Sequence, residues 1–504
     1  MKLNHCTSEN RLGEARTFAR LGSLLLVANL AGMSLTAMAD TPPAPGTPIP
    51  ATEGFEKRVV ATGLANPHNM VLGPDGYLWL TEQVSRKITR VNPKTGEVKV
   101  ALAVADAVHS QAANGHHEQD GLLGIALHPQ LLKGTGQDYV YVSLTYAGGD
   151  SEAFPNRTLI RRYTYDAKTN TLGEATDLLK GLPSARDHQS ARLLFGPDDK
   201  LYYSIGDQGA NQLSYLCEQN KAQMTPTAAQ VSKSDWVHYA GKILRLNLDG
   251  SVPDDNPVIN GVKSHVYAYG IRNVQGMVFV GDKLFATEQG PNSDDELNLI
   301  VKGGNYGWPY VAGFKDGQGY AYANYSAAKG GCKGNEDQYQ NGLKVPEGIP
   351  VQQETQWSST AFVEPLKTLF SVGNDYVYNQ PACKENNLFY ICWPTIAPSS
   401  VTYYSASGNA AKGWGNSLLI TSLKRGVVYR VQLDGSKTVP MGDATPVFRS
   451  LNRYRDIAVD PSGEVIYVAT DIESSLGTND KGSATAKFEN PGAILAFRST
   501  GKSR

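Results

Sequence analysis

A histidine that stands among carboxylates is the first candidate for chemistry in this chain of 504 residues. Asp187 and His188 lie just before an alternating apolar segment, and Asp207 lies just after the next one. A carboxylate beside a histidine can fix its tautomer and raise its basicity, which suits a general base. A structural histidine is the alternative, so the surrounding groups have to decide. Gln212 adds a further polar side chain to the turn after Asp207.

Basic and amide side chains recur near the ends of other alternating segments. Because the formal net charge of the whole chain is only -1, these local cations predict an anionic ligand and give no footprint for nucleic acid. Arginine suits such a ligand because it can clamp a carboxylate with two parallel hydrogen bonds. The residues are Arg272, Asn273 and Gln275 in GIRNVQG, Lys424 in SLKRGVVYR, and Arg453 and Arg455 in NRYRD.

A third candidate is the segment from Glu288 to Pro309. It holds a Gly-Pro turn, three consecutive acids and an aromatic, glycine-punctuated tail within 22 residues. The acids are Asp294, Asp295 and Glu296. Carboxylates at this spacing repel one another, and a hard cation such as calcium is an economical way to hold them together. A solvated acidic loop is the alternative interpretation.

Short strands are predicted to position these groups. A turn of the Gly-Pro-Asp kind, followed by an alternating segment rich in aromatics, recurs along the chain. Period-two alternation with turn residues at both ends predicts strands, and helical patterns are scarce. The copies begin at Gly73, His128, Gly196, Val280, Gly415 and Asp460.

Six such units over about 450 residues predict an all-β fold, a six-bladed β-propeller of four-stranded antiparallel blades. Two-sheet sandwiches in tandem are the alternative, which the repeat length and the lack of linkers disfavour. Long inserts interrupt the units at 107–121, 208–239, 303–355 and 373–400. In a propeller such inserts gather on one face, which is therefore expected to hold the site.

The N-terminus predicts export. Basic residues precede an apolar run from Leu21 to Leu30, and Ala37-Met38-Ala39 has the form of a cleavage site. We expect a signal peptide over 1–39, a proline-rich linker over 40–55 and a single catalytic propeller over 56–500. No other apolar stretch approaches the roughly 18 residues that cross a bilayer. The mature protein is therefore expected in the periplasm or secreted, with no membrane span.

Export also predicts that the cysteines form disulfides, because an oxidising compartment favours them. Cys383 and Cys392 bracket a short loop and predict a local disulfide. Cys217 and Cys332 can pair as well. No CxxC motif or histidine-rich spacing indicates zinc.

In combination, these segments resemble the soluble glucose dehydrogenases that depend on pyrroloquinoline quinone (PQQ). The resemblance covers about residues 55–498 in one order and includes PSARDHQSARLLFGPD, YSIGDQGANQL, YICWPTIAPSS and GYAYANYSAA. It implies a six-bladed propeller and a periplasmic homodimer. It also implies PQQ as cofactor, with calcium both activating the cofactor and stabilising the dimer.

The resemblance assigns catalytic roles. His188 is the implied general base, which removes the proton of the C1 hydroxyl of the sugar while a hydride moves from C1 to C5 of the quinone. Asp187 and Asp207 orient it, and Arg272 stabilises the charge that develops on the C5 oxygen. Implied contacts with the sugar or its polar surroundings fall on Gln119, Gln212, Tyr390 and Trp393.

PQQ has three carboxylates, which would account for the scattered cations. Its implied contacts are Arg272, Asn273, Gln275, Lys424, Arg453 and Arg455. One calcium would take the backbone carbonyls of Gly290 and Pro291 and act as a Lewis acid on the quinone. Asp294 and Asp295 receive no role. The second implied calcium site consists of Glu296, Tyr306, Ala312, Phe314, Asp316 and Glu354.

Departures from the family pattern lie mainly at the rim of the site. Val274 replaces a proline, Asp120 replaces the asparagine after Gln119, and 107–118 form a longer insert. Phe314 stands where the family has tyrosine, which is harmless if only its carbonyl binds. Two histidines of the insert, His116 and His117, suit either a metal or a solvated loop.

The expected activity is oxidation of glucose and other aldoses at C1 to the lactone, with electrons passing to an external acceptor. A broad aldose sugar dehydrogenase of the same superfamily is the close alternative. A calcium-dependent propeller lactonase needs acids around a metal but not the lysine and arginine set. A non-catalytic binding propeller should lack the constellation of Asp187 and His188.

Overall fold

The predicted fold class is confirmed by a computed structural model. Cys383, Cys392, Tyr390 and His116 lie outside the residues that it describes, as do most of 1–55. Residues Ala37–Arg504 form one compact unit. The described residues are 38–40, 52, 54–112, 117–149, 151, 154–332, 345–378, 393–405, 411, 413–424, 426–472, 477–478, 484–485 and 488–500.

The first three blades are antiparallel sheets of four strands each, formed by consecutive parts of the chain. Blade 1 consists of β3 (Pro67–Leu72), β4 (Leu78–Glu82), β5 (Lys87–Val91) and β6 (Val98–Ala103). Blade 2 consists of β7 (Leu122–Leu127), β8 (Tyr139–Ala147), β9 (Asn156–Asp166) and β10 (Thr171–Ser184). Blade 3 consists of β11 (Ser190–Phe195), β12 (Leu201–Ile205), β13 (Lys242–Leu246) and β16 (Val266–Tyr269).

The remaining blades are also four-stranded, but the last blade takes one strand from the N-terminal part of the chain. Blade 4 consists of β17 (Val274–Val280), β18 (Lys283–Glu288), β19 (Asp295–Ile300) and β22 (Lys367–Leu369), and β1 (Met38–Asp40) pairs in parallel with β22. Blade 5 consists of β23 (Pro398–Tyr404), β24 (Ser417–Ser422), β25 (Val428–Leu433) and β26 (Pro440–Val447). Blade 6 consists of β27 (Tyr454–Val459), β28 (Val465–Thr470), β31 (Ile494–Ser499) and β2 (Phe55–Ala61).

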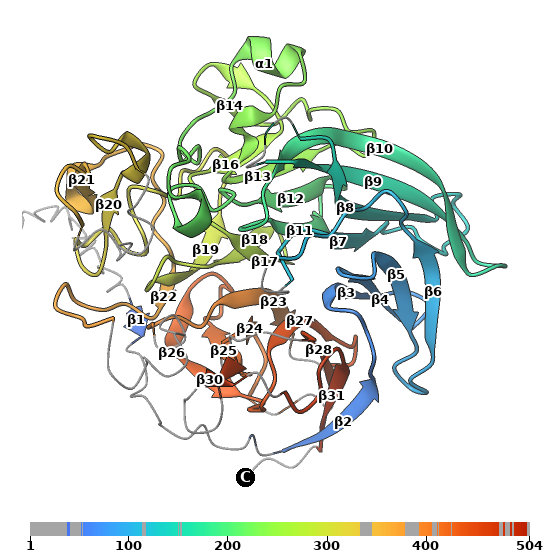
Figure 1. Cartoon of the computed structure of the whole chain (residues 1–504). Coiled ribbons are helices and arrows are strands. Elements are labelled where there is room, and N and C mark those ends of the chain that lie inside the picture. The colour runs from blue at the N-terminus through green and yellow to red at the C-terminus, as the bar shows by residue number, and fades with distance from the viewer. Residues whose placement is uncertain are drawn as a thin grey trace, which may run out of the picture. The chain divides into compact units, whose positions relative to one another are not determined.

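The ring of blades is closed by both ends of the described propeller. β2 pairs with β31, with Phe55 opposite Ser499. The first strands of the blades, β3, β7, β11, β17, β23 and β27, contact one another in a closed series around a common centre (Figure 1). Closure of this kind leaves only short, protected sheet edges.

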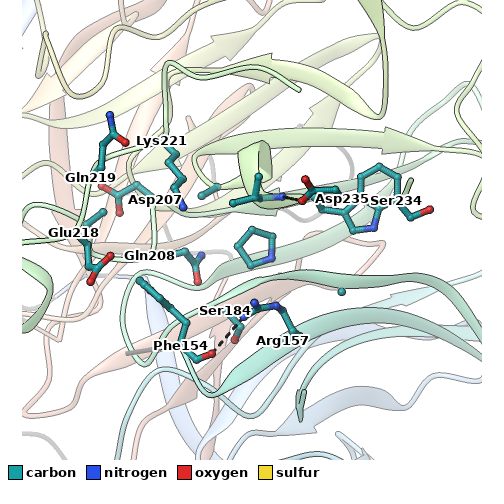
Figure 2. Close-up of a pocket in the computed structure, with 16 residues that line it drawn as sticks. Phe154, Arg157, Ser184, Asp207, Gln208, Glu218, Gln219, Lys221, Ser234 and Asp235 are labelled. Carbon is teal, nitrogen blue, oxygen red and sulfur yellow. Dashed lines mark hydrogen bonds between the residues drawn. The ribbon is translucent and has the colours of Figure 1, made fainter. Parts of the chain in front are cut away.

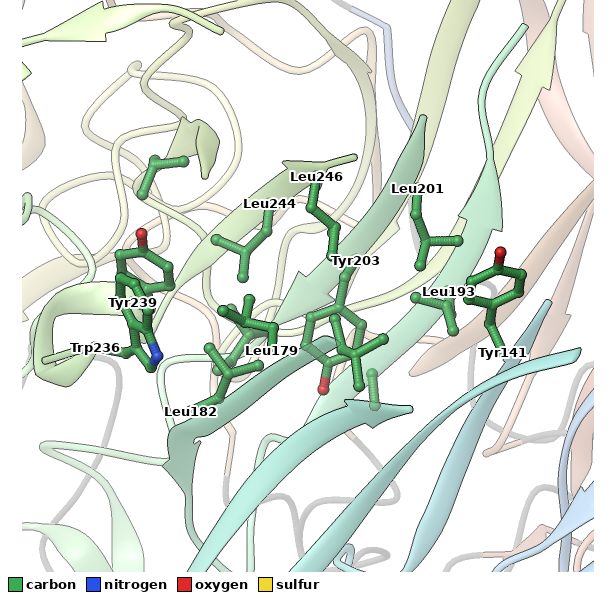
Figure 3. Close-up of a cluster of buried hydrophobic side chains, with 14 of the residues drawn as sticks. Tyr141, Leu179, Leu182, Leu193, Leu201, Tyr203, Trp236, Tyr239, Leu244 and Leu246 are labelled. Carbon is green, nitrogen blue, oxygen red and sulfur yellow. The ribbon is translucent and has the colours of Figure 1, made fainter. Parts of the chain in front are cut away.

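The core lies between neighbouring blades, because each sheet is covered on both faces. Central strands such as β4 and β12 are therefore buried at every residue, whereas the outer strand β6 is largely exposed. The cluster between blades 2 and 3 contains Tyr141 of β8 and Tyr203 of β12, both fully buried (Figure 3). Large aromatic side chains of this kind dominate the burial of apolar surface.

Inserts between strands carry what little other structure there is. The helical segments are η1 (Leu213–Tyr215), α1 (Ala228–Ser232), η2 (Val237–Tyr239), η3 (Tyr325–Ala327) and η5 (Glu354–Gln356). Small hairpins are β14 (Val258–Ile259) with β15 (Val262–Lys263), β20 (Ala321–Ala323) with β21 (Val351–Gln353), and β29 (Gly477–Thr478) with β30 (Ala484–Thr485). In the described part of the chain, no helix has the length and apolarity needed to cross a membrane.

Candidate active site

The predicted residues occupy two recurring positions in the blades. One is the segment that enters the first strand, where His188 precedes β11 and Arg272 precedes β17. The other follows the second strand, where Asp207 follows β12 and Lys424 follows β24. The first two strands of every blade are antiparallel, so both positions lie at the same end of the blade. The fold therefore brings distant segments to one face.

One cavity on this face, of about 180 Å³, gathers most of the predicted groups. The lining residues come from five of the six blades, from Gln119 before β7 to Arg455 in β27. Asp187, Asp207, Gln212 and Asn273 do not line it but contact residues that do. The predicted residues that line the cavity are Gln119, His188, Arg272, Gln275, Gly290, Pro291, Trp393, Lys424, Arg453 and Arg455.

A carboxylate holds one ring nitrogen of His188, and a second carboxylate lies near the other. Its Nδ1 lies 2.7 Å from Oδ1 of Asp207, and its Nε2 lies 3.9 Å from Oδ1 of Asp187. Donation from Nδ1–H to Asp207 leaves the lone pair on Nε2, the tautomer that a general base needs. The Asp187 carboxylate in turn accepts a hydrogen bond from the side-chain amide of Gln119.

Asp207 is buried yet remains the anion of this pair. Its other oxygen, Oδ2, accepts hydrogen bonds from Trp308 Nε1 at 2.7 Å and Asn220 Nδ2 at 2.9 Å. Burial alone would raise the pKa of Asp207, but His188, Arg272 and the Trp308 donor outweigh burial and lower it. An ionised Asp207 can both orient His188 and stabilise its protonated form.

The backbone at His188 has an uncommon conformation. His188 has φ of +47°, and Ser190 and Ala191 also have positive φ, at a bulge where β11 meets β12. Gly206 makes this possible on the facing strand, because a Cβ there would lie 1.9 Å from the carbonyl oxygen of His188. Such costly conformations persist where the surrounding structure enforces them, often at functional sites.

Both terminal nitrogens of the Arg272 guanidinium are hydrogen-bonded, whereas its Nε is not. It donates to Gln212 Oε1 at 2.6 Å and to the carbonyl oxygen of Gln289 at 2.9 Å. Its Nε and the Nε2 of Gln212 are buried and have no hydrogen-bond partner among the described residues. Asn273 accepts from the backbone and hydroxyl of Ser190 and so ties Arg272 to the His188 segment.

The other cations of the cavity wall belong to blades 5 and 6. Asp471 accepts from Arg453 Nε at 2.5 Å and from Arg455 Nε at 2.8 Å. Burial tends to raise the pKa of Asp471, but the two arginines outweigh burial and lower it. Lys424 donates to the carbonyl oxygen of Trp393 at 2.9 Å. The cavity thus has a surplus of fixed positive charge, which suits a polyanion.

The Gly290–Pro291 turn is anchored by Asp295, for which the sequence predicted no role. Asp295 Oδ1 accepts from the Gly290 amide at 2.9 Å, and Oδ2 accepts from the amides of Ile396 and Ala397. A Cβ at Gly290 would lie 2.0 Å from the Ser293 carbonyl oxygen, so the turn requires glycine. Asp295 therefore sets where the two neighbouring carbonyls lie.

A family model described as glucose/sorbosone dehydrogenase matches residues 64–369 and 373–477. The chain belongs to this family. It is 50% identical over 95% of its length to quinoprotein glucose dehydrogenase B of Acinetobacter calcoaceticus, of which it covers 98%. It is also 28% identical to aldose sugar dehydrogenase YliI of Escherichia coli, over 52% of this chain and 67% of that protein.

A solved structure agrees with this membership in the glucose/sorbosone dehydrogenase family. The PQQ-bound aldose sugar dehydrogenase of Streptomyces coelicolor is 26% identical to this chain, with a TM-score of 0.56. The match covers 89% of this chain and 99% of that one. The fold and the cavity described above thus belong to a sugar dehydrogenase family.

Glu296 and Glu354, two acids predicted for a second calcium, bind the same loop and do not line the cavity. Glu296 accepts from the Gly313 amide at 2.7 Å, and Glu354 accepts from the Ala312 amide at 2.9 Å and the Gly317 amide at 3.1 Å. Burial raises the pKa of Glu296 to about 7 and that of Glu354 to about 9. The interpretation of Asp294, Asp295 and Glu296 as a solvated acidic loop is wrong, because all three side chains are buried.

The remaining predicted ligands adjoin the same loop. Phe314 accepts through its carbonyl oxygen from the Asp316 amide at 2.8 Å, and the Tyr306 hydroxyl donates to the Leu299 carbonyl oxygen at 2.7 Å. Among the described residues, no three His, Cys, Asp or Glu side chains are grouped so that they could hold a metal. A calcium site here would therefore depend on backbone carbonyls, as the resemblance implies.

The departure at Asp120 has a structural account. Asp120 accepts from the amide and hydroxyl of Ser110 at 2.8 and 2.6 Å, and its backbone carbonyl lies 2.7 Å from His109 Nδ1. His109 Nε2 lies 2.8 Å from His117 Nδ1. Asp120 thus anchors the rim insert beside Gln119.

The sequence analysis did not predict several residues that support the site. Some of them occupy the same position in several blades, so the repeats could have revealed them. An acid stands at or just after the end of the second strand in four blades. Glu288, for example, accepts a hydrogen bond from the Arg272 backbone amide. Asp471 accepts from the side chains of Arg453 and Arg455. The four acids are Glu82, Asp207, Glu288 and Asp471.

Proposed function

We propose that this chain oxidises glucose and other aldoses at C1 to the lactone, with PQQ and calcium, and passes the electrons to an external acceptor. The observation that carries the proposal is that His188, Arg272 and the other predicted cations line one cavity. The names of the 50% identical relative and of the PQQ-bound structure support the choice of cofactor.

The cavity wall suits a tricarboxylic quinone. Its fixed cations exceed its acids, and Arg272 Nε and Gln212 Nε2 are buried without a partner among the described residues. Unmet buried donors are costly, so they favour a ligand rich in acceptor oxygens. When bound, PQQ supplies the hydride acceptor at its C5 carbonyl. Its contacts would be Arg272, Asn273, Gln275, Lys424, Arg453 and Arg455.

Calcium would occupy two places. The carbonyl oxygens of Gly290 and Pro291, which line the cavity, would hold a catalytic ion, and calcium supplies a Lewis acid there. Buried acids with raised pKa values support a second ion, since a cation would stabilise their charged forms. The second set would be Glu296, Tyr306, Ala312, Phe314, Asp316 and Glu354.

Within this scheme the protein moves one proton. His188 accepts the proton of the C1 hydroxyl on Nε2, while its Nδ1–H stays bonded to Asp207. Asp207 stabilises the resulting imidazolium, and Asp187 lies 3.9 Å from Nε2 with its carboxylate oriented by Gln119. Arg272 would stabilise the negative charge that develops on the C5 oxygen of the quinone. Trp393, with Tyr390, would wall the sugar.

Export and assembly complete the proposal. We assign 1–39 to a signal peptide and place the mature protein in the periplasm or outside the cell, as a homodimer. Cleavage after Ala39 would divide β1, which spans Met38–Asp40. N-terminal sequencing of protein from the periplasmic fraction tests the cleavage site, and light scattering tests the dimer. A mature N-terminus at Met1 or a monomer at micromolar concentration would contradict these two assignments.

Reconstitution tests the activity directly. Apoprotein is loaded with calcium and PQQ, and glucose-dependent dye reduction is followed with the quinone absorbance. Absence of both signals rejects the proposal. A panel of aldoses separates a glucose dehydrogenase from the broad aldose sugar dehydrogenase that the Streptomyces structure makes the second candidate. Hydrolysis of lactones by calcium-loaded protein without PQQ would instead indicate a lactonase.

A further inference from the structure

Two inserts from neighbouring blades are joined covalently at the edge of the active site. The first insert lies between β12 and β13 of blade 3, and the second lies between β19 and β22 of blade 4. Cys217 of the first forms a disulfide with Cys332 of the second, across 115 residues of sequence. This is the pairing that the sequence left open, and no role in the reaction follows from the family resemblance.

The same two inserts supply the contacts that hold the catalytic groups from behind. From the first insert, Gln212 accepts from Arg272 at 2.6 Å, and Asn220 donates to Asp207 at 2.9 Å. From the second, Trp308 Nε1 donates to the same Asp207 oxygen at 2.7 Å. Movement of one insert against the other would therefore disturb Asp207 and Arg272 together.

The first insert is packed incompletely on one side. A cavity of about 410 Å³ lies against it, and Figure 2 shows Asp207 and Gln208 beside this cavity with Glu218 and Lys221. Side chains that face a void lack contact partners on that side. The first insert therefore has fewer packing contacts on this side, and its links to the second insert limit its movement toward the cavity.

Hydrogen bonds join the two inserts in two places. Gln223 and Asn305 exchange hydrogen bonds at 2.9 and 2.8 Å, and a second set lies near the disulfide. Asn211 donates to the Ala323 carbonyl oxygen at 2.8 Å and accepts from the Tyr325 amide at 2.8 Å. Cys332 is buried, whereas Cys217 is exposed and open to a reductant in solution. The small apolar cluster that surrounds these contacts consists of Leu216, Ala323, Tyr325, Cys332 and Ile349.

We propose that the Cys217–Cys332 disulfide is a positioning bond for the catalytic groups. It keeps Gln212 against Arg272 and Asn220 against Asp207, so that turnover, more than substrate binding, depends on it. The effect on turnover rests on the proposed function, whereas the effect on the position of the insert does not. Reduction by a dithiol breaks the S–S bond, and the two electrons and two protons that it donates yield two thiols and a cyclic disulfide of the reductant.

The first test uses the double variant Cys217→Ser/Cys332→Ser, loaded with calcium and PQQ and assayed well below its unfolding temperature. Small misplacements of catalytic groups are costly, so we expect kcat to fall about threefold to tenfold, with KM changed less than about twofold. The exposed Lys233→Ala on the same insert is the matched control and should leave both constants unchanged. A lower Tm with an unchanged kcat would overturn the proposal.

The second test does not depend on activity. Amide hydrogen exchange of the apoprotein should accelerate over 207–221 in the double variant, with the strands of blade 3 unaffected. Unchanged exchange over 207–221 would overturn the proposal even if the loaded enzyme oxidised no aldose, which would separately reject the proposed function.

Reduction of the wild-type protein provides a third comparison. Apoprotein is treated with dithiothreitol and desalted before loading, since free thiols react with quinones. Its kcat should fall to that of the double variant, whereas the same treatment should leave the double variant itself unchanged. A further fall in the double variant would assign the effect to other cysteines and contradict the role of this bond.

Discussion

The guanidinium of Arg192 and the carboxylate of Asp456, 264 residues apart, form a two-pronged ion pair with distances of 3.0 and 3.1 Å. Both side chains are buried at the first strands of blades 3 and 6. Arg192 also donates to the carbonyl oxygens of Gln275 and Ser399, and Asp456 accepts from the Met70 amide. One pair therefore links the first strands of five blades.

Breaking this pair should destabilise the whole ring. In Arg192→Met or Asp456→Asn, the remaining charged or polar group loses its buried partner, and we expect the free energy of unfolding to fall by about 3–5 kcal/mol. The double variant should lose less than the sum of the two, because neither charge is left alone. Urea denaturation measures all three.

An exposed pair provides the control for this prediction. Arg498 and Glu464 lie 3.2 Å apart with exposed fractions of 62% and 32%, so Arg498→Met should cost less than about 1 kcal/mol. Equal losses at the buried and exposed pairs would contradict the assignment of Arg192 and Asp456 to the closure of the ring.

The role of His188 predicts a loss of turnover without a loss of cofactor. In His188→Ala, the hydrogen bond to Asp207 and the proton acceptor are both absent. General-base catalysis is typically worth about 10²- to 10⁴-fold, and we expect a loss of this size in kcat. Dye reduction measures turnover, and the quinone absorbance measures bound PQQ. Wild-type turnover would refute the assignment, and loss of PQQ would make His188 structural.

Much of this architecture was predictable because it repeats. Period-two alternation and turn residues mark the strands, and the repeated turn marks the blades. The end of the second strand is also a repeated position, so Asp471 and Glu288 could have been found by aligning the repeats with Asp207. The place of a residue within its blade follows from the local pattern of strands and turns, and a single sequence contains that pattern.

Other features depend on how the blades and inserts meet, which no local pattern specifies. The pairing of Arg192 with Asp456 follows from closure of the ring, and the anchoring of the Gly290 turn by Asp295 follows from the approach of the segment before β23. The disulfide partner of Cys217 was open for the same reason. Its partner lies in an insert of another blade.

Lys424 should contribute to cofactor affinity through its charge. Its ammonium is oriented by the Trp393 carbonyl oxygen and the Thr395 hydroxyl, and it lines the cavity. Hydrogen bonds to charged groups are worth about 1.5–3 kcal/mol, so Lys424→Met should weaken PQQ binding about 10- to 100-fold. Titration of apoprotein by quinone absorbance gives the affinity.

A lysine on the outside of the same blade provides the comparison. Lys437 is exposed on the hairpin between β25 and β26, far along the blade from the strand ends that form the site. Lys437→Met should leave PQQ affinity unchanged. If both variants bound PQQ as tightly as the wild-type protein does, Lys424 would not be a cofactor contact.

The buried acids predict an unusual dependence of stability on pH. Burial raises the pKa of Glu354 to about 9 and that of Asp294 to about 8, from ordinary values of 4.5 and 3.8. At a pH between the ordinary and the raised pKa of each acid, the folded apoprotein keeps a proton that the unfolded chain has released. Its stability should therefore fall as pH rises, by about 1.4 kcal/mol per pH unit for each such group.

Calcium should oppose this loss, because it binds the ionised acids and its affinity rises as they lose protons. We expect saturating calcium to raise Tm more at pH 8.5 than at pH 6, as measured by calorimetry. Glu354→Gln should reduce this difference, since it removes a buried acid that calcium would neutralise. Glu364→Gln, at an exposed glutamate before β22, is the control and should preserve it. A calcium effect that is independent of pH, or one that Glu354→Gln leaves intact, would remove Glu354 from the second calcium site.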